Sequence, residues 1–316
     1  MYKFLVLNKK IIFMAAGAAL ALGLLILLMI LIIAGFDFGK LSSVPAKEQK
    51  NYTAGSADLK SIIISDTDNS VRIAEGDGDK IEVVYYENSL EYYEINESNG
   101  ALSIKARNNK KWYDYVGVLN FQVQNTTLLV MVPKDVLEKL DIKTSNGSVT
   151  VESVSPARLL NIYTDNGKIA VTNINSQAGI VLTTSNGPLT LENINAAYIK
   201  GKTTNGNVKA ENIACKTFAG LSSTNAKIDA DVIKCGESIS LTSTNGRIRV
   251  GGLSANEINL KTSNASITGS VSGSIKDYII RSKTTNADNK LQNLDLGSKK
   301  LTVNTSNGKI DISFEN

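Results

Sequence analysis

Few residues of this chain have the types and spacing that catalysis uses. The sequence of 316 residues contains no histidine, which excludes His-based triads, histidine general bases and the usual zinc sites. Paired carboxylates could still cleave a polysaccharide, but here they stand singly. Glu152, Glu192 and Glu211 share one position of a repeat and are expected to face solvent. We therefore expect no catalytic residues and no enzyme, and a carbohydrate-active β-helix enzyme is the weakest alternative.

Signals for cofactors are equally scarce. The sequence has no phosphate-binding loop, dinucleotide fingerprint or Cys-x-x-Cys pair. The acidic run at residues 75–79 lacks EF-hand spacing and the nine-residue calcium repeat, so it is better interpreted as a solvated hairpin turn. We expect no cofactor, no metal site and no nucleic-acid partner.

The two cysteines could form a covalent link. Cys215 and Cys235 each follow a repeated asparagine by ten residues, so they occupy the same position in adjacent repeats. Stacked strands would bring their Cα atoms to about 4.8 Å, which suits a disulfide. A bridge closing a loop of about 20 residues would add about 3 kcal/mol. A pair of reduced, buried cysteines is the equal alternative.

Aromatic and basic residues are concentrated before the repeats. Tyrosines and the single tryptophan of the chain lie around a polar basic turn at residues 107–111. Cross-strand packing on a sheet face is the simpler interpretation. The sharper hypothesis is an exposed loop that binds envelope glycan or an anionic membrane surface. Its residues would be Arg107, Lys110, Lys111, Trp112, Tyr113 and Tyr115.

A repeat in the second half of the chain must position these groups. An asparagine recurs at intervals of 19 to 22 residues, with Thr or Ser two places before it and Gly or Ala one place after it. Asn-Gly favours a tight turn, and aliphatic residues alternate with period two on both sides. A fixed period near 20 predicts a solenoid. The repeated asparagines are Asn146, Asn166, Asn186, Asn205, Asn225, Asn245, Asn264, Asn286 and Asn307.

The alternation predicts that the repeated Thr or Ser and the asparagine both face the core. Stacked about 4.8 Å apart, the asparagine amides would then bond one another in a ladder. A ladder satisfies amides whose burial without a partner would cost about 1 to 3 kcal/mol each. We therefore interpret the asparagines as structural and not as ligand-binding residues.

The chain before the repeats contains one long apolar segment. Residues 11–34 carry no charged side chain and are long enough to cross a bilayer. The run exceeds the apolar stretch of a cleaved signal peptide, although cleavage stays the alternative. Lys9 and Lys10 directly before it predict a cytoplasmic tail and an exported C-terminal part.

The sequence thus predicts an all-β chain, a β-solenoid with rungs of about 20 residues preceded by one transmembrane helix. We divide it into a cytoplasmic tail (1–10), the helix (11–34), a linker (35–57), an N-terminal cap with irregular rungs (58–140) and regular solenoid repeats (141–316).

Several runs resemble the bacterial putative adhesin family, which includes LiaG-like proteins of Gram-positive envelopes. They include SVRIAEGDGDKIEVVYY, TSNGSVTVESV, TDNGKIAVTNI and STNGRIRVGGL, and the resemblance covers residues 58–316. It implies a β-solenoid at the cell surface and little established activity. The copies at Asn264 and Asn286 are stretched, with Asn289 where an aliphatic residue belongs, which predicts an inserted bulge or loop.

We expect a non-enzymatic single-pass protein of the cell membrane, with an extracytoplasmic C-terminal domain that acts as an adhesin or binds the cell envelope. Its partners would be the membrane, through the anchor, and a cell-wall glycan or an envelope protein. The alternative is an accessory or sensory subunit of an envelope-stress regulatory system. The last coil, residues 307–316, has no obvious cap, so its edge could template self-association.

Overall fold

The computed structural model describes residues 9–33, 35–36, 45–55, 58–111 and 126–315. The chain divides into two compact units. One comprises Met1–Lys47, Asn88–Glu91 and Asn108–Asn125, and the other comprises Glu48–Glu87, Tyr92–Arg107 and Thr126–Asn316.

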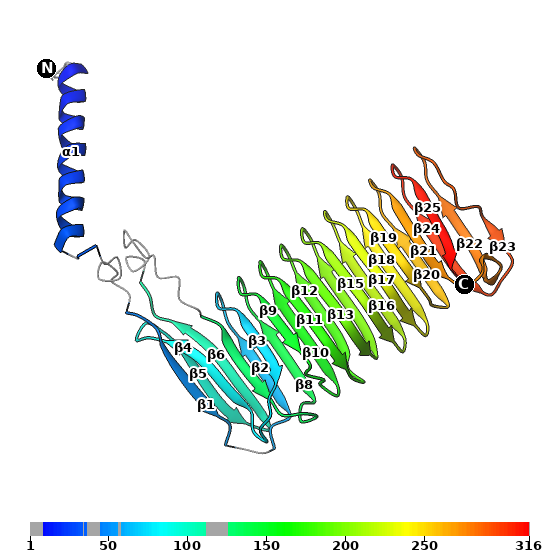
Figure 1. The fold of residues 1–316 in the computed structure, drawn as a ribbon, viewed down its shortest axis with the longest axis horizontal. Helices are drawn as coiled ribbons and strands as arrows, with labels where there is room; N and C mark the ends of the chain where they lie inside the picture. Colours follow the sequence, from blue (N-terminus) through cyan, green and yellow to red (C-terminus); the bar gives the residue numbers. More distant parts are fainter. Residues whose placement is uncertain (1–8, 34, 37–44, 56–57, 112–125, 316) are drawn as a thin grey trace, which may run out of the picture. The chain divides into compact units, whose positions relative to one another are not determined.

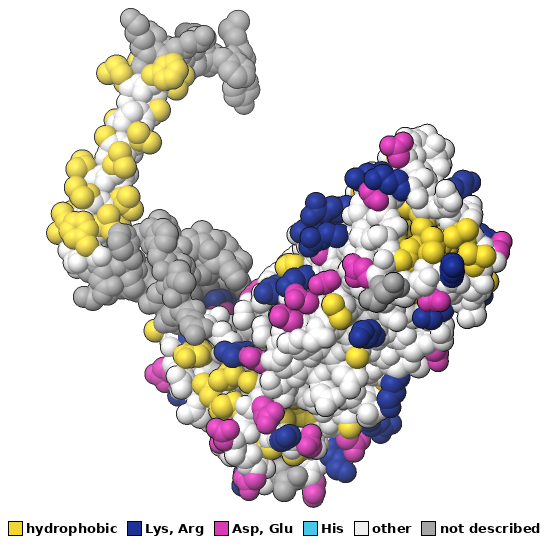
Figure 2. All heavy atoms as spheres, turned by 45° about the vertical axis from the view of Figure 1, so that its right-hand side comes forward, with side chains coloured by type: hydrophobic (Ala, Val, Ile, Leu, Met, Phe, Trp, Pro, Cys, Tyr) yellow, Lys and Arg dark blue, Asp and Glu magenta, His cyan; other side chains and the backbone are white. Residues whose placement is uncertain are grey.

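The first unit contains the helix α1 (Lys9–Ile33). Its segment Ile11–Ile33 is long and apolar enough to cross a membrane, judged by length and composition. Figure 2 shows hydrophobic side chains along the whole helix. The helix ends at Ile33, one residue before the predicted end of the apolar run at residue 34.

The second unit is built from two sheets that lie back to back around one core (Figure 1). In the described part of the chain, the 12-stranded sheet has the order β1 (Glu48–Thr53), β4 (Glu82–Glu87), β7 (Leu128–Val132), β3 (Val71–Glu75), β9 (Val149–Glu152), β11 (Ile169–Asn175), β13 (Leu189–Ala196), β15 (Val208–Cys215), β17 (Ile228–Cys235), β19 (Ile248–Leu253), β21 (Ile267–Ser272) and β25 (Ile310–Glu315).

The described strands of the 13-stranded sheet follow the order β23 (Leu294–Asp295), β22 (Tyr278–Lys283), β24 (Lys299–Asn304), β20 (Glu257–Lys261), β18 (Ser238–Ser243), β16 (Phe218–Ser223), β14 (Tyr198–Thr203), β12 (Gly179–Thr184), β10 (Leu159–Thr164), β8 (Lys139–Lys143), β2 (Ser61–Ser65), β6 (Ala101–Asn108) and β5 (Glu91–Ser98).

Each regular rung supplies one strand to each sheet. In the rung of β10 and β11, Ile162 and Ile169 are fully buried on either side of the turn. The next rung stacks on it in parallel register, so that Ile162 pairs with Leu182 and Ile169 with Leu189. Because every rung repeats the same apolar positions, the stacked side chains form one continuous core. The predicted β-solenoid is confirmed.

At both ends the order of stacking differs from the order of the sequence. The rung of β2 and β3 lies between that of β8 and β9 and that of β6 and β7. At the other end, β24 lies between β20 and β22, although β22 comes earlier in the chain. The sequence does not predict this stacking order, because every rung has the same alternating apolar pattern and could pack against any other rung.

The C-terminal coil therefore lies elsewhere than the repeat order suggests. Its strand β24 is flanked on both sides, and β25 forms the edge of the 12-stranded sheet among the described strands. Part of that edge is covered, since Lys290 N–H donates to the Ile310 carbonyl at 3.0 Å and Ile310 N–H donates to the Asp288 carbonyl at 2.9 Å. The end expected to lack a cap is thus partly capped by an earlier segment.

The stretched copies contain the predicted insertion. A 3-10 helix, η3 (Ile275–Asp277), follows β21 and carries the chain past one rung position into β22. In this outer rung two normally aliphatic positions are polar, and the Ser282 hydroxyl donates to Asn289 Oδ1 at 2.9 Å. This hydrogen bond gives each of the two polar side chains a partner at the end of the core.

The structure adds two strands that the sequence does not predict. β1 lies inside the range assigned to the linker and pairs antiparallel with β4. Its sequence, EQKNYT, has no apolar alternation, because backbone pairing at a sheet edge requires little apolar surface. β5 carries Tyr92 and Tyr93 next to β6, at the edge of the 13-stranded sheet.

Candidate functional site

The repeated asparagines form one row along the turns of the solenoid. Asn166 Nδ2 donates to Asn146 Oδ1 at 2.7 Å, and Asn186 Nδ2 donates to Asn166 Oδ1 at 2.6 Å. The same bond links Asn205, Asn225, Asn245 and Asn264 in turn, and then continues through Asn307 to Asn286. We call this the asparagine row. It brings together all nine asparagines that the sequence singled out.

The asparagine row lies on the surface, which corrects the expectation that it faces the core. Its side chains are exposed, whereas the Thr or Ser two places earlier is buried in the regular rungs. In one turn the Thr164 hydroxyl accepts from Gly167 N–H at 3.1 Å and donates to the Gly147 carbonyl of the preceding rung at 3.2 Å. The tight turn closed by these bonds ends the alternation of the strand, so Asn166 turns outward.

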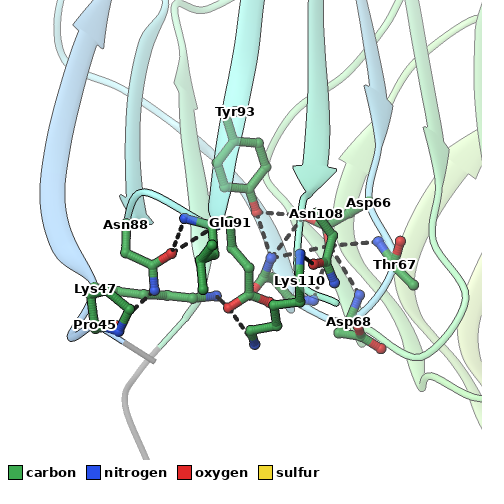
Figure 3. A network of polar contacts seen from close by, with 12 residues as sticks. Pro45, Lys47, Asp66, Thr67, Asp68, Asn88, Glu91, Tyr93, Asn108 and Lys110 are labelled. Atoms are coloured by element: carbon green, nitrogen blue, oxygen red, sulfur yellow. Dashed lines mark hydrogen bonds and ion pairs between the residues drawn. The ribbon is translucent and has the colours of Figure 1, made fainter. Parts of the chain in front are cut away.

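The row begins on a structured acidic turn (Figure 3). Asp68 Oδ1 accepts from Asn146 Nδ2 at 2.6 Å and so takes the place of an asparagine. Asp66, buried at the position of the repeated Thr, accepts from the N–H groups of Thr67 at 2.7 Å and Asn69 at 3.0 Å. Tyr93 points toward Asp66 and donates its hydroxyl hydrogen to Oδ2. These hydrogen bonds fix the conformation of the turn.

A second row of asparagines, which sequence reasoning missed, runs where the strands of the 12-stranded sheet bend. Asn193 Nδ2 donates to Asn173 Oδ1 at 3.1 Å, and Asn212 Nδ2 donates to Asn193 Oδ1 at 2.8 Å. All three have positive φ, between 54° and 56°. The signal is an asparagine seven places after the turn asparagine in three successive copies. The next rung has Val232 there, with φ of 51°.

The two cysteines are joined by a disulfide between adjacent rungs. Cys215 and Cys235 are register partners of β15 and β17, with Cα atoms 4.6 Å apart. Both side chains are buried, so the link lies inside the solenoid and not on a binding surface.

The proposed binding loop is described only in part. Arg107 pairs with Glu94 at 2.7 Å, and this hydrogen-bonded guanidinium holds the pKa of the Glu94 carboxyl below its ordinary value. Lys110 pairs with Glu91 at 2.7 Å. Lys111 also has an interaction partner. Trp112, Tyr113 and Tyr115 lie outside the described residues.

Of the carboxylates that share one repeat position, two lie side by side and two have a basic partner. Glu192 and Glu211 are register partners on neighbouring strands, and both are half-buried. Glu211 pairs with Lys209 at 2.7 Å, and Glu152 pairs with Arg72 at 3.1 Å. Among the described residues, no three His, Cys, Asp or Glu side chains are arranged to hold a metal ion.

The fold and its rows of side chains define a β-solenoid of two stacked, mostly parallel sheets. Residues 59–313 match the family described as Toastrack DUF4097, and the chain belongs to this family. The resemblance noted from the repeat motifs is thereby confirmed. No curated protein matches the chain.

Several solved structures also match this chain. The chain is similar to a putative adhesin from Bacteroides fragilis NCTC 9343, with 15% identity and a TM-score of 0.49 over 85% of this chain and 99% of that chain. A putative adhesin from Parabacteroides merdae ATCC 43184 gives 12% identity and 0.25, covering 85% and 96%. A putative cell adhesion protein from Clostridium sporogenes ATCC 15579 gives 7% and 0.22, covering 85% and 100%.

Proposed function

We propose that this chain is a membrane-anchored, extracytoplasmic, non-enzymatic protein of the adhesin type that binds an extended polymer of the cell envelope. One observation carries the proposal. The solenoid repeats the same exposed amide from rung to rung, in register, along the asparagine row. A stiff array with one short repeat is complementary to a ligand that also repeats, because each additional unit makes the same contact again.

The apolar helix supports the anchored arrangement. Ile11–Ile33 has the length and composition of a membrane span, and the basic residues Lys9 and Lys10 precede it. Positive charge flanking a span favours the cytoplasmic side. This orientation exports the solenoid and places it beside the polymers of the envelope.

The test is sedimentation of the purified full chain, held in detergent, with insoluble cell-wall material. We expect the chain to pellet with the wall in a saturable manner, while an unrelated single-pass protein in the same detergent stays in solution. A second arm passes solubilised membrane proteins over the immobilised chain. Capture of one membrane protein without wall binding would overturn the proposal and favour an accessory or sensory subunit.

A further inference from the structure

Two aromatic side chains lie against glycines on the outer face of the 13-stranded sheet. Tyr198 and Phe218 begin neighbouring strands whose residues Ile199 and Ala219 are register partners. Tyr198 covers Gly179 of the preceding rung, and Phe218 covers Gly220 of its own strand. A β-carbon at either glycine would overlap the ring above it. The two glycines therefore let the rings lie against the sheet.

Glycine is unfavourable in the interior of a strand, and it is retained there where another group approaches closely. Tyr198 and Phe218 are both half-buried, so part of each ring faces outward. Such a ring also shields the exposed backbone, a known way of stabilising a strand that contains glycine. The groups around the rings distinguish a purely structural role from a binding role.

Phe218 is part of a shallow groove of about 350 Å³. The lining of the groove is more apolar than polar, and it includes the hydroxyl groups of Thr183, Ser222, Ser240 and Thr242. Tyr198 lines a second depression on the same sheet, of about 650 Å³, whose charged lining residues are Lys60, Lys139, Arg158, Asp58 and Glu138. An apolar platform within a ring of hydroxyl groups is the usual composition of a site for a polar ligand with an apolar face.

The groove is positively charged. Among its described lining residues, Lys200 and Lys202 carry charge, and neither forms an ion pair with a described residue. Lys200 Nζ stands 5.5 Å from the centroid of the Tyr198 ring. A cation held beside an aromatic face can pair with an acidic group of a ligand that stacks on that face.

We infer that this surface, which we call the aromatic groove, binds a glycan that carries acidic groups. The C–H face of a sugar ring would stack on Phe218 and Tyr198, its hydroxyl groups would meet the Ser and Thr side chains, and its acidic groups would pair with Lys200 and Lys202. A purely phosphate-based polymer offers nothing to the aromatic rings, so the rings favour a glycan. The inference rests on the proposed function and names an acidic glycan as the polymer, bound at a surface other than the asparagine row.

The experiment uses the full chain in detergent and two probes, intact wall material and soluble glycan strands released from it that keep their acidic groups. We expect Tyr198→Ala and Phe218→Ala each to weaken binding of the soluble strands about tenfold, which corresponds to about 1.4 kcal/mol. Tyr163→Ala is the matched control, because Tyr163 lies on the same sheet face beside Lys143 but outside both depressions.

Further variants separate binding from folding. Tyr198→Phe and Phe218→Tyr keep the rings, so both variants are expected to bind the strands as the wild type does. The double variant Lys200→Gln, Lys202→Gln should bind the acidic strands more weakly. It should bind strands whose acidic groups have been neutralised with unchanged affinity. Melting temperatures are measured for every variant. If the alanine variants melt earlier but bind the strands as the wild type does, the rings only shield the sheet and the inference is overturned.

The outcomes also separate this inference from the proposed function. Wild-type chain that binds neither wall nor strands would refute the proposed function. If the wild-type chain binds the wall and the alanine variants bind as tightly as the wild type, the proposed function stands and the aromatic groove is rejected as the binding site.

Discussion

Asp68 accepts the side-chain amide hydrogen of Asn146 at 2.6 Å, and it thereby closes the N-terminal end of the asparagine row. A carboxylate accepts hydrogen bonds but donates none, so it ends a chain of amides in which each donor points toward the preceding rung. Every other bond of the row runs in the same direction, with the amide donating toward the N-terminal end of the stack. The residue at that end therefore only needs to accept, as an aspartate does.

Replacing Asn205 by leucine should destabilise the solenoid by about 1 to 2 kcal/mol. The change removes the bond that Asn205 donates to Asn186 at 2.7 Å and the bond that it accepts from Asn225 at 2.6 Å. Chemical denaturation of the full chain measures the loss. Asn207→Leu, at an exposed position outside the row, is the control. Equal midpoints for Asn205→Leu and the wild type would deny the row a stabilising role.

Replacing Val232 by asparagine should stabilise the protein by about 1 kcal/mol. A β-branched residue is strained at its φ of 51°, while asparagine tolerates that conformation and matches the residue at the same position in the preceding rung, Asn212. The same replacement at Val181, which is not among the positive-φ residues, should not stabilise. A lower melting temperature for Val232→Asn would contradict this explanation.

Reducing the link between Cys215 and Cys235 should lower the free energy of unfolding by about 3 kcal/mol, since the two cysteines are 20 residues apart in sequence. Thiol titration of the native chain before and after reduction, followed by denaturation of each form, checks the value. Two free thiols before any reductant is added would show that the link is absent. A double Cys→Ser variant should match the reduced form and should not respond to reductant.

Stability should fall between pH 10 and pH 12 because of Tyr52. Its hydroxyl donates to Glu97 at 2.6 Å, and this hydrogen bond raises the pKa of Tyr52 to about 12, above the ordinary value of 10.0. A raised folded-state pKa means that the contribution is fully present below pH 10 and is lost as pH rises through the folded pKa.

The comparison of wild type with Tyr52→Phe isolates this effect. The stability difference between the two proteins should be constant below pH 10 and should shrink toward pH 12, as followed by denaturant titrations at each pH. A difference that stays constant up to pH 12 would show that the Tyr52 hydroxyl does not titrate as described.

The fold could be predicted because each rung repeats the same local pattern. Ile162, Leu182 and the other aliphatic residues four places before seven of the nine asparagines mark the core directly. The outward direction of Asn166 could not be predicted from alternation, because the Thr164 turn interrupts the strand. The position of β24 between β20 and β22 depends on contacts between segments that are distant in sequence. The repeat period does not indicate which rungs become neighbours.

The aromatic groove was also beyond sequence reasoning. Tyr198 and Phe218 share one repeat position, but only two successive copies carry an aromatic residue there. Their meaning depends on Gly179 and Gly220, one on another rung and one two places along the strand. Each ring meets its glycine only in the folded structure.

The exchange of rung order has a consequence for biosynthesis. Residues 278–283 emerge from the ribosome before residues 299–304, yet β22 pairs along its length with β24. During synthesis, β22 must therefore remain with an open backbone edge until residues 299–304 have emerged. Open edges recruit other strands, so a pause in synthesis at this stage would expose the nascent protein to aggregation.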